Sequence, residues 1–167
     1  MPNWCSNSLT LKHDDPAMID KAVAGFTDGK LLETFVPYEG EWDYDWCVSN
    51  WGTKWDIGGT DGNAIDIPDG NGTVRGLALS FDSAWAPPIQ AYEKLEELGF
   101  KILAMYYEPG MAFAGIFEDG QDDYYEYGGL DSVGIAETLP VELDEAFGIS
   151  ESAAEWKQRT LRTKRTS

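Results

Sequence analysis

The order in which two hydrophobic periodicities follow one another is the feature that most limits how this chain of 167 residues can fold. Residues 3–12 have a two-residue period that places Cys5, Asn7, Leu9 and Leu11 on one face, which predicts a β-strand. An N-cap at Asp14-Asp15-Pro16 follows, and apolar residues then recur at helical spacing up to Phe26. The chain therefore begins with a strand and an amphipathic helix.

The same periodicities recur further along the chain. Strands are predicted at 64–67, 73–82 and 100–107, and a helix that begins after Pro87-Pro88 and ends at Gly99 separates the last two. The predicted order is strand, helix, strand, strand, helix, strand, which is the βαββαβ order of ferredoxin-like folds. Two more strands, at 111–118 and 122–127, flank the tight-turn sequence Asp119-Gly120 and predict a hairpin. We expect an α+β protein, in which a ferredoxin-like βαββαβ sheet carries an added C-terminal hairpin and a small helical annex.

Two segments lie outside this regular order. Residues 31–60, rich in aromatic and acidic side chains, form an insertion within a predicted domain at 1–127. Residues 128–167 form a helical annex with a basic tail. In this annex, Thr138-Leu139-Pro140 predicts a short helix that Gly148 ends, and Ser152 and Glu155 have the spacing of a capping box that opens a last helix.

The charge of the chain is strongly negative and unevenly distributed. It has 30 acidic and 12 basic residues, a formal net charge of −18. Residues 102–156 contain thirteen acids and no Lys or Arg, whereas the last eleven residues contain five bases and no acid. Phosphate binding needs cations that replace counterions, so we expect no direct contact of the body with nucleic acid and no binding to anionic membranes. A basic or nucleic-acid-binding host protein is the expected partner; an acidity that only maintains solubility is the alternative.

One acidic segment has a regular pattern. Around the predicted hairpin, carboxylates are interleaved with tyrosines, and spaced carboxylates of this kind can imitate a phosphate backbone and bind arginines strongly where they are desolvated. A solvated acidic face is the alternative interpretation. The predicted binding residues are Glu118, Asp119, Asp122, Asp123, Tyr124, Tyr125 and Glu126.

Four separated strings carry a family resemblance. They are Met1-Pro2-Asn3-Trp4-Cys5-Ser6-Asn7, Asn50-Trp51-Gly52-Thr53-Lys54-Trp55-Asp56, Phe81-Asp82-Ser83-Ala84-Trp85-Ala86-Pro87-Pro88, and Tyr106-Tyr107-Glu108-Pro109-Gly110-Met111-Ala112-Phe113-Ala114-Gly115. Together they resemble the YubB ferredoxin-like domain family, whose members come from phages, plasmids and other mobile elements. The resemblance implies a ferredoxin-like fold and a mobile-element origin, and it implies no particular activity.

The same strings suggest an alternative site. Four tryptophans could line an aromatic recess with charged residues at its rim, which would suit a small ligand or a peptide. The competing interpretation is structural, because aromatic clusters are more often core than site. The residues of this alternative pocket are Trp4, Trp51, Lys54, Trp55, Asp56, Trp85 and Glu108.

Signatures of catalysis, metals and cofactors are weak. His13 is the only histidine and has no clear nucleophile partner, and Cys5 and Cys47 form no metal-binding motif. We therefore expect no metal, no cofactor and buried free thiols, and a non-enzymatic protein is favoured over an enzyme. The chain shows no secretory signal and no apolar stretch of bilayer length, so a bacterial cytoplasmic location is expected.

Three hypotheses follow. The first is an acidic binding protein of a mobile element that inhibits a nucleic-acid-handling defence protein, of the anti-CRISPR or anti-restriction type, by nucleic-acid mimicry. The second is a small-molecule-binding or enzymatic domain that uses the aromatic region around Trp51, Trp85 and Glu108. The third is a structural or assembly protein. The sequence leaves the oligomeric state open.

Overall fold

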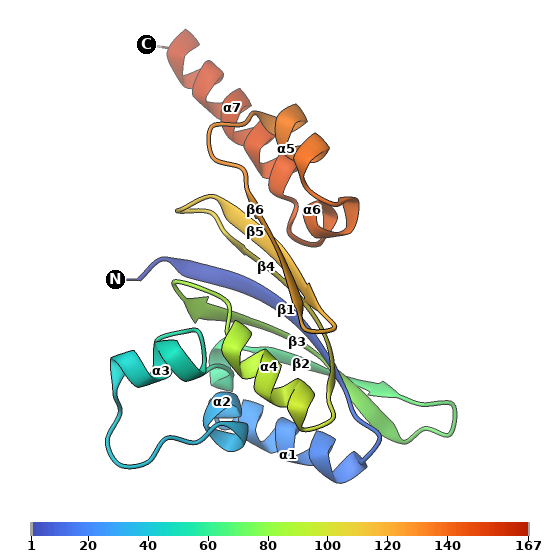
Figure 1. Cartoon of the computed structure of the whole chain (residues 1–167). Coiled ribbons are helices and arrows are strands. Elements are labelled where there is room, and N and C mark those ends of the chain that lie inside the picture. The colour runs from blue at the N-terminus through green and yellow to red at the C-terminus, as the bar shows by residue number, and fades with distance from the viewer. Residues whose placement is uncertain (1, 167) are drawn as a thin grey trace.

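The computed structural model describes residues 2–166, which form a six-stranded antiparallel sheet with α-helices on both faces (Figure 1). The order of strands across the sheet is β2-β3-β1-β4-β5-β6. The strands are β1 (Trp4–Lys12), β2 (Asn63–Pro68), β3 (Val74–Ala84), β4 (Lys101–Glu108), β5 (Phe113–Glu118) and β6 (Gln121–Glu126). The helices are α1 (Pro16–Thr27), α2 (Leu31–Phe35), α3 (Tyr44–Asn50), α4 (Ile89–Glu97), α5 (Ser132–Thr138), α6 (Val141–Phe147) and α7 (Ile149–Arg165), with a short 3-10 helix η1 (Gly59–Asp61). The α+β class is thus confirmed.

Strand β1 lies at the centre of the larger core. Its register pairs Leu9 with Leu79 of β3 and with Ala104 of β4, so three apolar side chains lie in one row on the same face. Helices α1 and α4 cover this face, and Figure 1 shows them on one side of the sheet. The predicted alternation of β1 is confirmed, because Cys5, Asn7, Leu9 and Leu11 are all buried.

Local signals determine where α1 begins and ends. The Asp15 carboxylate accepts a hydrogen bond from the Ala17 amide at 3.0 Å, and Pro16 is the first helical residue. Gly29, at a φ of 71°, lets the chain leave the helix in the left-handed region.

The insertion between α1 and β2 is organised around Trp51. This side chain is 1% exposed, and its indole Nε1 donates a hydrogen bond to the Val36 carbonyl at 2.8 Å. The rings of Tyr38 and Trp46 contact it, with centroid distances of 5.8 and 5.7 Å. A tryptophan in the core with a satisfied N–H thus holds α2 and α3 against the rest of the domain.

The residues that follow β6 pack onto the second face of the same sheet. Helix α6 lies on β4 and β5, α5 and α7 pack against α6 and against each other, and their apolar side chains form a second core cluster with the sheet. Figure 1 shows these helices on the side opposite to α1 and α4. The buried residues of this cluster are Ala114, Tyr127, Ile135, Leu139, Leu143 and Ile149.

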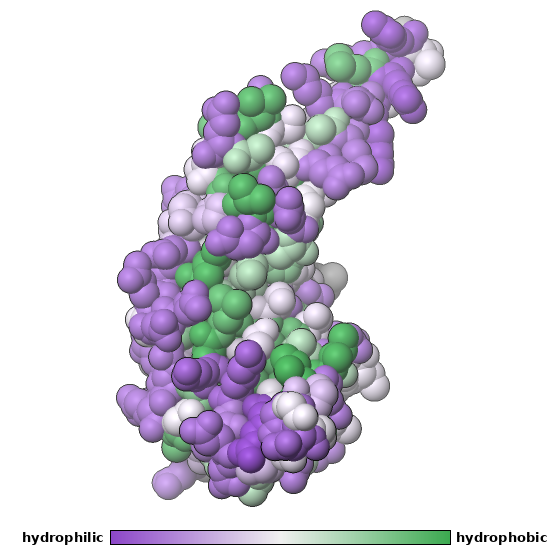
Figure 2. Space-filling view, turned by 90° about the vertical axis from the view of Figure 1, so that its right-hand side faces the viewer, coloured by the Kyte–Doolittle hydropathy of each residue, from purple (hydrophilic) through white to green (hydrophobic). Residues whose placement is uncertain are grey.

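One prediction for this annex was wrong, and one helix was not predicted. Helix α5 was not predicted, and α7 begins at Ile149, so Ser152 and Glu155 lie inside the helix and form no capping box. The helix begins earlier because the Asp144 carboxylate, six residues before Ser150, accepts hydrogen bonds from both the amide and the hydroxyl of Ser150 and holds the α6–α7 junction. The basic end of α7 projects from the body (Figures 1 and 2).

Within residues 2–166, no helix combines the length and the apolar character that crossing a membrane requires. Met1 and Ser167, which bound the two predicted domains, lie outside the described residues.

We predict that Trp51→Ala lowers the free energy of unfolding by about 3–5 kcal/mol, because it empties a large core site and leaves the Val36 carbonyl without its donor. Trp156, which is 70% exposed on α7, provides the matched control. Trp156→Ala should change the free energy of unfolding by no more than about 0.5 kcal/mol. Urea unfolding followed by circular dichroism measures both, and equal effects of the two substitutions would contradict the role given to Trp51.

Candidate functional site

The predicted acidic site lies at one edge of the sheet. Strand β6 pairs with β5 and has no strand on its other side within the described residues. Among residues 2–166, none of the five predicted carboxylates, at positions 118, 119, 122, 123 and 126, takes part in an ion pair. The hairpin therefore presents uncompensated negative charge along an exposed edge.

The seven predicted residues do not share one face. The two-residue period of β6 directs Asp122, Tyr124 and Glu126 to the face that carries α4, and Asp123 and Tyr125 to the face that carries α5–α7. Tyr125 is half-buried and packs against the second core cluster. The site is thus an edge with two rows of side chains.

Asp122 is tied to the interior by a hydrogen bond. The hydroxyl of buried Tyr106 donates to its carboxylate at 2.6 Å. Partial desolvation raises the pKa of Asp122, the bond from Tyr106 opposes this shift, and the neighbouring charge of Asp123 adds to it. Tyr106 lies on β4 and Asp122 on β6, and Gly115 lies on β5 between them. The glycine leaves room for the Tyr106 ring, because a Cβ at this position would meet the Tyr106 side chain.

Two further contacts order the acidic edge. The Tyr124 ring packs on Phe113 at 5.4 Å between centroids, and its hydroxyl donates to Glu126 at 3.3 Å. At the hairpin turn, the Gly120 amide donates to the carboxylate of Glu96 on α4 at 3.0 Å. The sequence analysis missed Glu96, because no local pattern signals a contact between α4 and a turn 24 residues away.

The alternative aromatic pocket is not one site. Trp4 and Trp55 meet with ring centroids 6.0 Å apart and line a recess of about 360 Å³ together with Asp56. Trp51 and Glu108 are instead buried, each 1% exposed, and take no part in it. The hypothesis of a single recess was wrong because Trp51 is needed in the core.

The remaining residues of the predicted pocket lie apart from one another. Trp85 is exposed outside the recess and adopts a φ of 71°, which is uncommon for a side chain of its size. The Lys54 ammonium lies over the Trp55 ring, 4.4 Å from its centroid, and forms no ion pair with Asp56 within the described chain.

The two carboxylates of this predicted pocket bind backbone amides. The Asp56 carboxylate accepts hydrogen bonds from the Leu32 and Glu33 amides at 2.7 and 2.9 Å, and it thereby caps the start of α2 from a loop that is distant in the sequence. Burial raises the pKa of Asp56, and these amide bonds oppose the shift. Glu108 accepts from the amides of Gly110 and Met111 and closes the β4–β5 turn.

The four strings that carry the family resemblance converge at one end of the sheet. Asn7 donates to Ser83 at 2.9 Å, and Ser83 donates to the Ala86 carbonyl at 2.7 Å. Thr53 donates to the Ala84 carbonyl at 2.9 Å. The Asn3 side-chain amide donates to the Glu108 carboxylate at 3.5 Å. Each of the four strings is therefore joined to at least one other string by a hydrogen bond. This network accounts for much of their unusual composition without a ligand.

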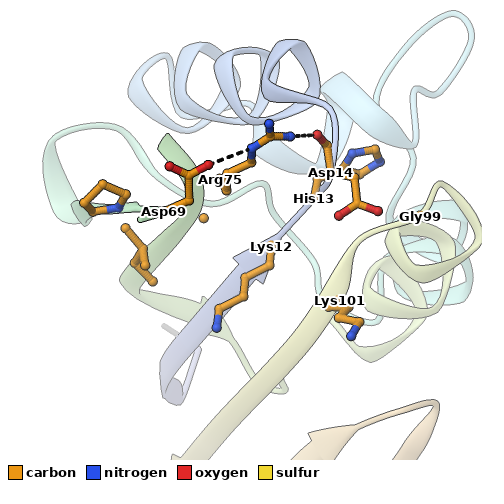
Figure 3. Close-up of a pocket in the computed structure, with 10 residues that line it drawn as sticks. Lys12, His13, Asp14, Asp69, Arg75, Gly99 and Lys101 are labelled. Carbon is orange, nitrogen blue, oxygen red and sulfur yellow. Dashed lines mark hydrogen bonds and ion pairs between the residues drawn. The ribbon is translucent and has the colours of Figure 1, made fainter. Parts of the chain in front are cut away.

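A cavity of the opposite charge lies at the other end of β1. It measures about 500 Å³ and is lined by cationic residues from three strands, namely Lys12, Arg75 and Lys101 (Figure 3). Asp69 and Asp14 lie beside Arg75, whose guanidinium binds the Asp69 carboxylate at 3.3 Å and the Asp14 carbonyl. No sequence pattern pointed to this cavity.

The two thiols and the side chains that could bind metals are further candidates for a second site within residues 2–166. Cys5 and Cys47 are free and buried, as predicted, and burial raises the pKa of both. In the part of the chain that the structure describes, no three His, Cys, Asp or Glu side chains are grouped so that they could hold a metal ion.

We predict that Asp122→Asn removes a pH-dependent contribution to stability. Because the folded-state pKa of Asp122 is raised, its contribution is present at low pH and is lost as the pH rises through that pKa. The difference in free energy of unfolding, Asp122→Asn minus wild type, should therefore become more positive as the pH rises from about 4 to about 7. Asp123→Asn removes the same charge one residue away, and an equal pH trend in both variants would contradict the assignment.

Comparisons with known proteins assign this chain to no family. No protein-family model matches the chain, and no curated protein matches it. A crystal structure of the protein api92 from Yersinia pseudotuberculosis, whose description names the family model DUF1281, is similar over 59% of this chain, with 22% sequence identity and a TM-score of 0.39. The match spans 40% of that chain. The resemblance to the YubB family stays a prediction.

Proposed function

We propose that this chain is a non-enzymatic acidic binding protein of a phage or plasmid, and that it inhibits a nucleic-acid-handling defence protein of the host, of the CRISPR or restriction type, by nucleic-acid mimicry. The observation that carries the proposal is the position of the acidic hairpin. Its carboxylates line an edge strand, and no ion pair within residues 2–166 neutralises them.

The two rows of side chains on the edge strand suit this role. Asp122 and Glu126 project to one face of the sheet and Asp123 projects to the other. A cationic groove that straddles this edge would therefore meet carboxylates on both of its walls. Tyr124, half exposed beside them, adds an aromatic surface of the kind that arginine guanidinium groups stack on.

Helix α4 extends the negative surface. Glu93 and Glu97 are exposed on it, and Glu96 is bonded to the hairpin turn. Its single base, Lys94, lies 3.5 Å from Glu97 and leaves the local charge negative. A region with this excess of carboxylates should steer a cationic protein surface toward it at low ionic strength.

We also propose that the first four strands form a ferredoxin-like unit. The order β1, α1, β2, β3, α4, β4 along the chain agrees with the βαββαβ order, and α1 and α4 lie on the same face of the sheet. The insertion with α2 and α3 and the hairpin β5–β6 would then be additions to that unit. The unit itself supplies no activity.

We predict that the double variant Asp123→Lys/Glu126→Lys loses its partner. Tagged protein is used to capture proteins from a bacterial lysate that contains CRISPR and restriction enzymes, and mass spectrometry identifies them. Wild type should retain a nucleic-acid-binding protein at low salt, and duplex DNA should displace it. The double variant should bind it about tenfold or more weakly, because two cations then face the cationic surface of the partner.

Helix α6 offers a matched control, since Glu142 and Glu145 are exposed there and lie outside the acidic hairpin. Glu142→Lys/Glu145→Lys makes the same change in net charge and should keep the partner. Equal weakening in both variants would mean that only total charge matters. Failure of DNA to compete would contradict mimicry.

A small-molecule-binding or enzymatic domain is the second candidate, supported by the recess that Trp4 and Trp55 line. Both rings are more than one third exposed, so Trp4→Ala/Trp55→Ala should leave the fold intact. We expect this variant to capture the same partner as wild type. Loss of the partner with an unchanged melting temperature would favour the recess over the acidic edge.

A further inference from the structure

Positive charge is scarce in the body of this protein, and much of it gathers in the cavity of Figure 3. The chain has seven Lys and Arg residues before the basic tail that starts at Lys157, and three of them line this one cavity: Lys12, Arg75 and Lys101. Asp14 and Asp69 also line the cavity, so its lining has three cations and two carboxylates in a chain of net charge −18.

The floor of the cavity is a single row of residues across four strands. The register pairs Ile67 of β2 with Gly76 of β3, Gly76 with Lys12 of β1, and Lys12 with Lys101 of β4. Gly76 creates the hollow, because a Cβ there would lie 3.1 Å from the Lys12 side chain and 3.4 Å from that of Ile67. Across the four strands, the row therefore has an apolar side chain, a glycine without a side chain and two lysines.

The two lysines occupy directly opposite positions of β1 and β4. Like charges directly opposite in adjacent strands destabilise a sheet. Neither Lys12 nor Lys101 forms an ion pair with any residue between 2 and 166. A bound anion would remove this repulsion and would hydrogen-bond both ammonium groups.

The walls of the cavity are held in place by their own hydrogen bonds. Arg75 is bound to the Asp69 carboxylate and to the Asp14 carbonyl, so Asp69 is already paired, and the Asp14 carboxylate is the other acidic group in the lining. The Nδ1 atom of His13 accepts a hydrogen bond from the Asp15 amide, and its Nε2 atom lies 2.9 Å from the Leu98 carbonyl and is the donor there. Both of its nitrogens are occupied, so His13 shapes the wall and does not contact the anion.

We propose that this cavity binds a phosphate monoester of a small molecule, with the phosphate between Lys12 and Lys101 and the apolar part of the ligand over Gly76 against Ile67. The phosphate class follows from two adjacent point charges, which suit a compact dianion. The size of the cavity lies within the range of small-molecule sites. The proposal does not depend on the acidic edge, which is formed by other residues.

Adenosine 5′-monophosphate serves as the probe. Adenosine tests the nucleoside part of this probe alone, and inorganic phosphate tests the phosphate part alone. Titrations of the full chain are followed by amide chemical shifts at low ionic strength. We expect saturable shifts at Gly76 and Lys101 with the monophosphate, weaker binding of inorganic phosphate and no saturation with adenosine. Adenosine binding as tight as the monophosphate would overturn the charge argument.

The double variant Lys12→Gln/Lys101→Gln should lower the affinity for the monophosphate by about tenfold or more, because it removes both charged donors. Lys21→Gln/Lys94→Gln is the matched control, which removes two exposed charges from α1 and α4. It should bind the monophosphate like wild type. The proposal fails if wild type shows no saturable shift, or if the two double variants bind equally well.

Melting temperature provides the second readout. Without ligand, Lys12→Gln/Lys101→Gln should melt no lower than wild type, because it relieves the repulsion between the two strands. With the monophosphate, only wild type and the control should gain melting temperature. A large loss of melting temperature in the ligand-free variant would give these lysines a purely structural role and overturn the proposal.

Discussion

The rest of the fold depends on the central position of β1, which is hydrogen-bonded to β3 along one edge and to β4 along the other. These two pairings join the two helix-connected halves of the chain into one sheet. They also place the leucines of β1 in rows with apolar residues of both neighbours, so α1 and α4 cover a continuous apolar surface. A shift of one residue in either pairing would turn these leucines toward the other face, which makes the register strongly specified.

The same sheet separates charges of opposite sign. The acidic hairpin lies at the β6 edge, whereas the cationic row lies over β3, β1 and β4. The total charge of −18 alone would suggest a uniformly negative surface. Rigid strand pairing prevents the two lysines of the row from approaching the carboxylates of β6, so a local site of positive charge persists in an acidic protein.

Several polar residues that look functional in the sequence have structural duties. Asp56 and Glu108 use their carboxylates to satisfy backbone amides that would otherwise lack partners. Asn7 and Thr53 instead donate hydrogen bonds to the end of β3, Asn7 to the Phe81 carbonyl and the Ser83 hydroxyl and Thr53 to the Ala84 carbonyl. Polar contacts of this kind therefore account for strings that are far apart in the sequence, whereas the carboxylates of β6 accept from side chains and from no backbone amide that the described contacts include.

The sequence by itself determined the elements whose signals are local. The alternation of β1, the Asp15-Pro16 start of α1, the Asp119-Gly120 turn and the acidity of the hairpin are all properties of adjacent residues, and the structure agrees with them. Only the tertiary structure decided which residues meet. It separated Trp51 from Trp4, joined Asp56 to α2 and aligned Ile67, Gly76, Lys12 and Lys101 in one row. Such contacts depend on strand order and register, which arise from burial of the whole core and leave no periodic mark on any single segment.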